Sequence, residues 1–144
     1  MVDENELREK MTKLETVKSQ IQAMEGQKEY VRDLIADHKE AIKTVENYIK
    51  QGDDEEMFIP IGGNAHVMSK TEGCDKVLIG IGADVSALTE TETAEEIMEK
   101  RKKELKQNMT SLANSIDQLS SEYQKLESEV QREYMELQSQ MQQG

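Results

Sequence analysis

Apolar residues recur at alternating steps of three and four positions along two long stretches of the chain. The first stretch runs from Leu7 to Ile49, and the second runs from Met98 to Gln140. The few polar exceptions are Lys10, Lys28 and His38 in the first stretch and Lys102, Glu133 and Gln140 in the second. A repeat of this kind over roughly six heptads is typical of a left-handed coiled coil. The pattern therefore predicts two long helices that pack along narrow apolar seams.

Residues near the ends of both stretches are typical of helix termini. Asp3 is predicted to cap the first helix, together with Glu6 three residues later, and Gly52 is predicted to end it. The second helix is predicted to open at Thr93, because Thr93 and Glu96 match a capping box.

The period changes in the middle of the chain, where short apolar runs alternate with turn residues. The run 57–61 is followed by Gly62-Gly63-Asn64 and then by 65–68, which predicts a β-hairpin with Pro60 at an edge or a bulge. The run 76–81, the turn at 82–84 and the run 85–88 predict a second hairpin. Two isolated hairpins are at best marginally stable in water, so their open edges are expected to need partner strands.

Joined by a compact insert, the two helices are predicted to fold back as an antiparallel pair. The register that fills most layers with apolar side chains places Val17 opposite Val130, Met24 opposite Tyr123 and Ile49 opposite Met98. The predicted fold is mainly α with a small β part: a helix over 1–52, two hairpins over 53–91 and a helix over 92–144.

Composition narrows the function classes. The net charge of −12 argues against a nucleic-acid partner, and the basic run Lys100–Lys103 is interpreted as a solvated helix face because acidic residues flank it. No apolar stretch approaches the roughly 20 residues that cross a bilayer, so no membrane partner is expected. The one cysteine, Cys74, is expected to be buried or inert, with no intrachain disulfide. These features together predict a soluble protein of the cytoplasm.

The candidate chemical motifs are weak. Gly80 and Gly82 lack the remaining residues of a phosphate-binding loop, and His38 and His66 lie far apart along the chain. The acidic run 53–56 is interpreted as a solvated loop. No nucleophile, base and orienting group come together. The sequence therefore predicts no catalytic residue, no cofactor, no metal site and no enzymatic activity.

The middle segment resembles the alpha-class subunit of prefoldin. The resemblance rests on Phe58-Ile59-Pro60-Ile61-Gly62-Gly63-Asn64-Ala65 in the first hairpin and on Asp75-Lys76-Val77-Leu78-Ile79-Gly80-Ile81-Gly82-Ala83-Asp84-Val85 in the second. Two hairpins are typical of the alpha class, whereas the beta class carries one, and the short chain looks like an archaeal member.

The resemblance implies an ATP-independent chaperone subunit. Two alpha-class and four beta-class subunits would assemble a platform of β-barrels from their hairpins, with the coiled coils extending from it. Their tips would capture unfolded polypeptides and deliver them to a group II chaperonin. The residues expected to make the oligomer contacts are Phe58, Ile59, Ile61, Val67, Val77, Leu78, Ile79, Ile81 and Val85. The residues expected to bind clients are Leu7, Met11, Tyr134, Met135, Leu137 and Met141. The alternative function is a structural coiled-coil tether or scaffold.

Overall fold

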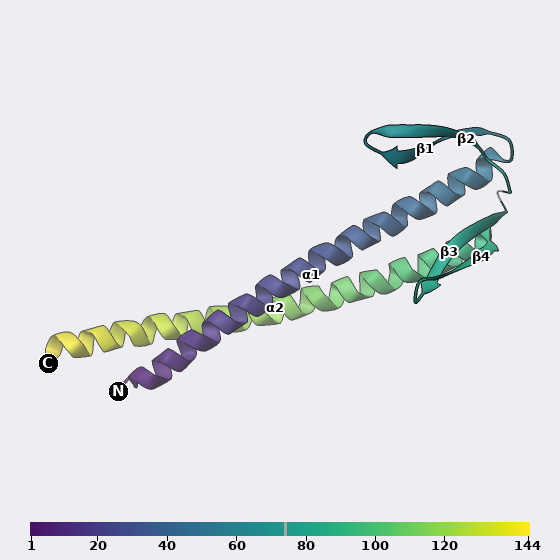
Figure 1. Ribbon diagram of the computed structural model, residues 1–144. Helices are drawn as coiled ribbons and strands as arrows, with labels where there is room; N and C mark the ends of the chain where they lie inside the picture. The colour runs from purple at the N-terminus through teal and green to yellow at the C-terminus, as the bar shows by residue number, and fades with distance from the viewer. Residues whose placement is uncertain (74) are drawn as a thin grey trace. The chain divides into compact units, whose positions relative to one another are not determined.

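The computed structural model describes residues 1–73 and 75–144, so Cys74 and the prediction made for it lie outside the described residues. The elements, in chain order, are α1 (Glu4–Gln51), β1 (Glu56–Gly62), β2 (Ala65–Lys70), β3 (Lys76–Gly82), β4 (Val85–Glu90) and α2 (Thr91–Gln143). Two long helices with two antiparallel hairpins between them confirm the predicted fold class (Figure 1).

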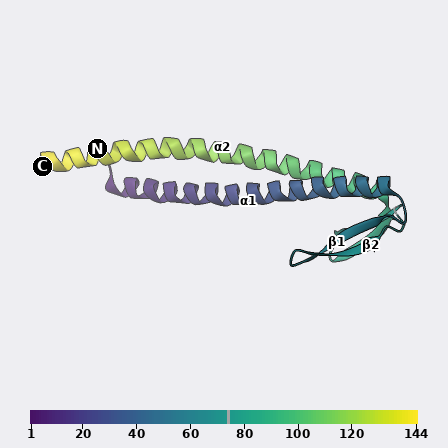
Figure 2. The ribbon, with the colours of Figure 1, turned by 90° about the horizontal axis from the view of Figure 1, so that it is seen from above.

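The chain divides into two compact units. The terminal unit contains residues 1–32 and 107–144, and the hairpin unit contains residues 33–106. In the terminal unit the beginning of α1 and the end of α2 run side by side in opposite directions, with both chain ends at the same end of the pair (Figures 1 and 2). In the hairpin unit β1 and β2 lie beside the end of α1, and β3 and β4 lie beside the start of α2 (Figure 1).

The ends of α1 are those that local chemistry predicts. The Asp3 carboxylate accepts a hydrogen bond from the backbone N–H of Asn5 at 2.9 Å, which satisfies one of the free donors at the helix start. Gly52 follows the last helical residue with a φ of +74°, the left-handed conformation that commonly ends a helix.

The start of α2 differs from the prediction. The helix begins at Thr91, two residues before Thr93. Thr91 is buried, and its backbone N–H donates to the carbonyl of Asp75 at 2.9 Å, which ties the start of the helix to the base of the second hairpin. The capping box of Thr93 and Glu96 considers only neighbouring residues. It therefore could not predict a helix start that depends on a hydrogen bond to Asp75.

The two hairpins are near copies of each other, displaced by twenty residues. Phe58 pairs with Met68 as Leu78 pairs with Leu88, and both hairpins carry an irregularity just before the turn, between Pro60 and Gly62 and between Gly80 and Gly82. The position of Pro60 at this bulge confirms the prediction. Each sheet of the described residues has two strands, so every strand leaves one edge without a partner strand.

The base of each hairpin is closed by a buried threonine. Thr71 donates its backbone N–H to the carbonyl of Glu55 at 2.8 Å, matching the bond from Thr91 to Asp75 in the second copy. The hydroxyl of Thr71 also donates to the carbonyl of Gly52 at 2.7 Å and accepts the N–H of Glu55 at 2.9 Å. These bonds fasten the first hairpin to the end of α1.

Replacing Ala83 by Gly is expected to stabilise the second hairpin by about 1 kcal/mol, because a side chain in the left-handed region costs about that much. The two turn residues of the second hairpin, Ala83 and Asp84, have φ values of +49° and +59°, and glycine occupies the equivalent position, Gly63, in the first hairpin. The matched variant Gly63→Ala should destabilise the first hairpin by a similar amount. Urea unfolding of both variants measures the change, and equal stabilities would show that the turns tolerate either residue.

Candidate assembly and client-binding surfaces

The core of the hairpin unit contains one strand residue among helix residues. Ile42 of α1 and Ala94 and Met98 of α2 form a buried cluster with Ile79 of β3, and Val77 packs partly buried against it. Ile79 is only 7 % exposed. Val77 and Ile79 were predicted as contacts to other subunits; in this chain Ile79 is buried and Val77 is partly buried against helix residues of the same chain. The two residues share one face of β3 because side chains alternate along a strand.

Two further hydrogen bonds hold the hairpins to the helices. The Arg101 guanidinium of α2 donates to the carbonyl of Gly80 in β3 at 2.5 Å. The Tyr48 hydroxyl of α1 donates to the carbonyl of Glu72, between the two hairpins, at 2.9 Å. The inward face of the second hairpin is therefore occupied within the chain.

The outward faces of the hairpins carry exposed apolar cross-strand pairs. Phe58 and Met68 are 66 % and 62 % exposed, and the equivalent Leu78 and Leu88 are 67 % and 64 % exposed. Met68 and Leu88 were not predicted from the sequence, although strand pairing places each opposite a predicted contact residue. The other predicted contact residues that are exposed are Ile59, Ile61, Val67, Ile81 and Val85. Large apolar side chains gathered in this way on a surface mark an interaction site.

The helix ends of the terminal unit carry most of the predicted client-binding residues. Met11, Tyr134, Met135 and Met141 are exposed, and Leu137 is half-buried. Leu7 differs, because only 3 % of its surface is exposed in this chain. The remaining five residues are named the tip surface: Met11, Tyr134, Met135, Leu137 and Met141.

An ion pair fixes the register of the two helices in the terminal unit. Lys10 donates a side-chain hydrogen bond to Glu133 and lies 3.8 Å from the carboxylate of Glu129. Lys10 and Glu133 are both polar exceptions in the apolar seams. The predicted register would have placed Leu137 opposite Lys10, so it is wrong by about one helical turn. A charge in one seam is stabilised by the opposite charge in the other.

The environment of Lys10 also changes its pKa. The hydrogen bond to Glu133 raises the pKa of the Lys10 ammonium above its ordinary value, desolvation opposes this, and the charges of Glu133, Glu129 and Glu6 add to the increase. A raised lysine pKa means that the folded state holds the proton more tightly than the unfolded state. The contribution of the ion pair to stability is therefore complete at neutral pH and is lost as the pH rises through the raised pKa.

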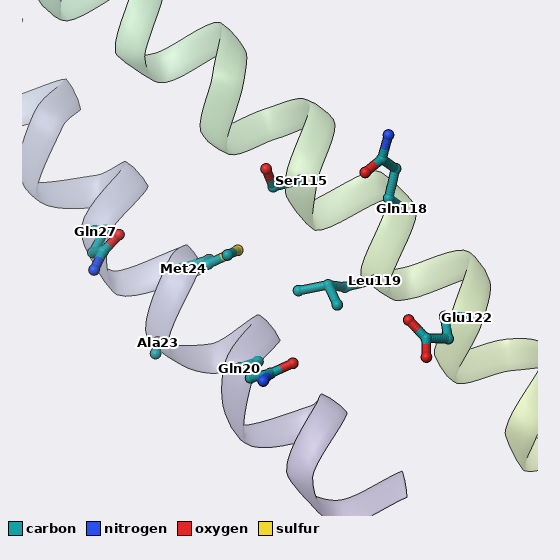
Figure 3. Close-up of a pocket in the computed structure, with 8 residues that line it drawn as sticks. All are labelled: Gln20, Ala23, Met24, Gln27, Ser115, Gln118, Leu119 and Glu122. Carbon is teal, nitrogen blue, oxygen red and sulfur yellow. The ribbon is translucent and has the colours of Figure 1, made fainter. Parts of the chain in front are cut away.

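A shallow groove between the helices shows the same shift in register. Its floor contains Met24 of α1 and Leu119 of α2, whose side chains point toward each other in Figure 3. The groove encloses about 490 Å³, and its other lining residues are Gln20, Ala23, Gln27, Ser115, Gln118 and Glu122. Tyr123, the predicted partner of Met24, is not among them. In the hairpin unit, Ile42 shares a cluster with Met98, whereas Ile49 had been predicted opposite Met98.

Cysteines at positions 24 and 119 are expected to form a disulfide rapidly under mild oxidation in a Cys74→Ser background. Crosslinking needs Cα atoms within about 7 Å, which facing seam positions provide. The pair at positions 24 and 123 is the matched control and should react at least about tenfold more slowly, since a four-residue shift moves the thiol about 6 Å along the helix. Non-reducing electrophoresis over time measures both rates. If the control pair forms its disulfide faster, the register predicted from the sequence, with Met24 opposite Tyr123, would be supported instead.

The described ranges, 1–73 and 75–144, offer apolar surface rather than a centre for ion binding. Within them no three histidine, cysteine or carboxylate side chains gather closely enough to hold a metal ion. Among the described residues, neither helix contains a stretch apolar enough to span a bilayer.

Comparison with known proteins gives consistent matches over most of the chain. The family model described as Prefoldin subunit matches residues 17–136. The prefoldin subunit alpha 1 of Methanocaldococcus jannaschii is 31 % identical over 126 residues, which cover 83 % of this chain and 86 % of that protein. The putative prefoldin subunit alpha of Aquifex aeolicus is 26 % identical over 113 residues, which cover 74 % of this chain and 76 % of that protein.

The fold also matches a solved structure. A chain of the filamentous PFD from Methanocaldococcus jannaschii, determined by cryo-EM, superposes with a TM-score of 0.72 and 24 % sequence identity. The match covers 82 % of this chain and 98 % of that chain. Helices, hairpins and their order therefore agree with a known architecture over nearly the whole of the solved chain.

Proposed function

The chain belongs to the prefoldin family, whose members are non-enzymatic subunits of chaperone complexes, and we propose that it is an alpha-class subunit that holds non-native polypeptides without ATP. The observation that carries this proposal is the tip surface. Tyr134, Met135 and Met141 are 51 %, 72 % and 75 % exposed at the end of a helix that already has an apolar seam to pack against its partner. Such side chains contribute little to folding, and they are suited to capturing the apolar segments of unfolded chains.

Methionine makes this surface adaptable. Its side chain is unbranched and polarisable, so it fits apolar partners of many shapes. Surfaces of this type bind many partners with little sequence preference. A holdase needs that property, because its clients share exposed apolar surface but no common sequence.

The hairpins support the assembly part of the proposal. Residues 53–91 would form the oligomerisation platform, in which the open edges pair with hairpins of other subunits and the outward pairs Phe58–Met68 and Leu78–Leu88 become buried. The relatives are named as alpha subunits, so the partners would be beta-class subunits, with two alpha and four beta chains in a hetero-hexamer. The hexamer would work in the cytoplasm and deliver its clients to a group II chaperonin.

The proposal is tested by mixing the purified chain with a beta-class prefoldin subunit and measuring the aggregation of a chemically denatured client by light scattering. No nucleotide is added. The expected result is suppression of aggregation by the complex at a near-stoichiometric ratio to client. A structural tether, the second candidate, would assemble with the same partner and leave aggregation unchanged. That outcome would contradict the holdase function.

A further inference from the structure

The groove between the helices of the terminal unit continues into a second hollow. The second hollow encloses about 410 Å³, and Gln27 and Ser115 line both hollows. Its other lining residues are Tyr30, Val31, Asn108, Ser111 and Leu112. The two hollows together are named the long groove. On α1 the long groove extends from Gln20 to Val31, which is about 17 Å at 1.5 Å per residue.

The long groove has an apolar floor and a polar rim. The floor consists of side chains that are only half-buried and still offer apolar surface: Met24, Val31, Leu112 and Leu119. The rim consists of uncharged amides and hydroxyls from both helices, several of them labelled in Figure 3: Gln20, Gln27, Asn108, Ser111, Ser115 and Gln118. Within the described part of the chain, no hydrogen bond joins the side-chain amides of the rim to another residue, so they are available to a ligand.

Charged residues are scarce on both helices along the long groove. Asp117 is the one charged residue in the fifteen positions 107–121, and Glu25 is the one charged residue in the nine positions 19–27. In the whole chain 33 % of the residues are charged, so several more would be expected here. The serines and asparagines that stand in their place form helices less readily than glutamate, lysine or arginine. Helix formation therefore does not account for this composition, whereas recognition of an uncharged ligand does.

Small side chains keep the long groove open. Ala23 on α1 and Ser111 and Ser115 on α2 line it with short side chains that leave the floor accessible. Ser111 and Ser115 are four positions apart, so they lie on the same face of α2. These two positions are therefore the points at which longer side chains would close the groove.

An extended polypeptide fits this combination of groups. Its backbone N–H and C=O groups are not paired within the segment, so they need partners when the segment leaves water. Amide side chains and hydroxyls both donate and accept hydrogen bonds, so they bind such a backbone whatever its side chains are. At about 3.4 Å per residue, a groove of about 17 Å holds about five residues. A helix satisfies its own backbone groups, and a nucleic acid needs cations, whereas Glu122 is the one charged group among the described lining residues.

We propose that the long groove is a second binding site for non-native polypeptides, separate from the tip surface. The rim holds the backbone of an extended segment by hydrogen bonds, and an apolar side chain of that segment lies against Met24 and Leu119. The inference rests on the proposed holdase function, since it names a further site for the same clients. Two weak sites on one unit hold a long client more firmly than either alone, because binding at one raises the effective concentration at the other.

The first experiment locates a bound polypeptide by crosslinking. A benzophenone group is attached to the cysteine of a Gln27→Cys variant, in a Cys74→Ser background, and the chain is assembled with a beta-class prefoldin subunit. The probe is fluorescently labelled α-lactalbumin that has been reduced and alkylated, so that it stays unfolded. Irradiation is expected to crosslink this position to the probe more efficiently than the same group in a Gln22→Cys variant, because Gln22 is exposed outside the groove.

The second experiment fills the long groove. Ser111→Glu with Ser115→Lys places two long side chains over the floor, leaves the net charge unchanged and supports the helix, because glutamate and lysine four positions apart attract each other. Thr110→Glu with Asn114→Lys is the matched control, since it introduces the same pair at exposed positions outside the groove. The filled variant is expected to release the labelled probe about tenfold faster than the parent, because one of two linked sites is lost. The control should release it as the parent does, and circular dichroism checks that both variants stay helical.

Equal crosslinking from the Gln27→Cys and Gln22→Cys variants, or a filled variant that releases the probe as slowly as the control, would overturn the proposal. Crosslinks from the Gln27→Cys variant to another arm of the complex in place of the probe would also overturn it, because the groove would then hold a helix. A different result would separate the two proposals. If the parent complex crosslinks the probe from the groove but does not suppress aggregation of a client, the binding site stands and the holdase function falls.

Discussion

Placing two charges on the outward face of the second hairpin, with Leu78→Lys and Leu88→Lys, is expected to abolish assembly with beta-class subunits and leave the chain folded. The two leucines form a cross-strand pair and are both largely exposed, so the substitutions cost the isolated chain little. In an assembled platform the same positions would be buried. An unpaired charge that is buried costs several kcal/mol, which is enough to remove most of a complex.

Two measurements check this expectation: the mass of the complex by light scattering after size exclusion, and the helical content by circular dichroism. Gln107→Lys with Asn108→Lys is the matched control, since it adds the same charge at exposed positions of α2. The control should assemble normally. A full-sized complex that contains the Leu78→Lys, Leu88→Lys chain would show that the outward face of this hairpin is not part of the platform.

The inward face of the same hairpin should respond differently. Ile79→Lys introduces a charge into the cluster with Ile42, Ala94 and Met98, so it is expected to destabilise the chain itself by about 3 kcal/mol or more. Thermal unfolding of the isolated chain measures that loss. Loss of assembly by Ile79→Lys would therefore not distinguish a platform contact from a folding defect, and the outward pair is the sharper test.

Removing the apolar side chains of the tip surface should strongly weaken the suppression of client aggregation. In the variant Met11→Ser, Tyr134→Ser, Met135→Ser and Met141→Ser, the concentration of complex that halves client aggregation should rise at least about tenfold. Burying one large apolar side chain is worth about 1.5–3 kcal/mol, so the loss of even one such contact per client changes affinity about tenfold or more. The melting temperature should change little, because all four side chains are exposed in the chain.

A matched control replaces polar residues at the same end of α2 and leaves the apolar residues of the tip surface unchanged. Gln138→Ser with Gln142→Ser changes exposed residues at the same end of α2 and should suppress aggregation as the parent does. The measurement uses several clients of different size, because the arms of the beta-class subunits also contribute. Unchanged suppression by the four-residue variant, across all clients, would place the client site away from the tip surface.

The amino-acid sequence by itself determined the elements of this protein. Heptad spacing predicted both helices, Asp3 and Gly52 predicted the ends of α1, and Gly62-Gly63-Asn64 predicted the turn of the first hairpin. All of these depend on interactions between residues close together along the chain. Most of the exposed apolar residues of the tip surface and of the hairpins followed from the same patterns, whereas Met68 and Leu88 did not.

Tertiary structure decided how these elements meet. Apolar seams that repeat every three or four residues can slide by a turn at little cost in burial, so the seams alone did not select a register. The pairing of Lys10 with Glu133 selects one, and the two residues are 123 positions apart. In the same way, alternation along β3 showed that Val77 and Ile79 share a face, but only packing showed that the face is covered by helices of the same chain. The start of α2 at Thr91 likewise depends on tertiary structure, because the Thr91 N–H donates to the carbonyl of Asp75 at the base of the second hairpin.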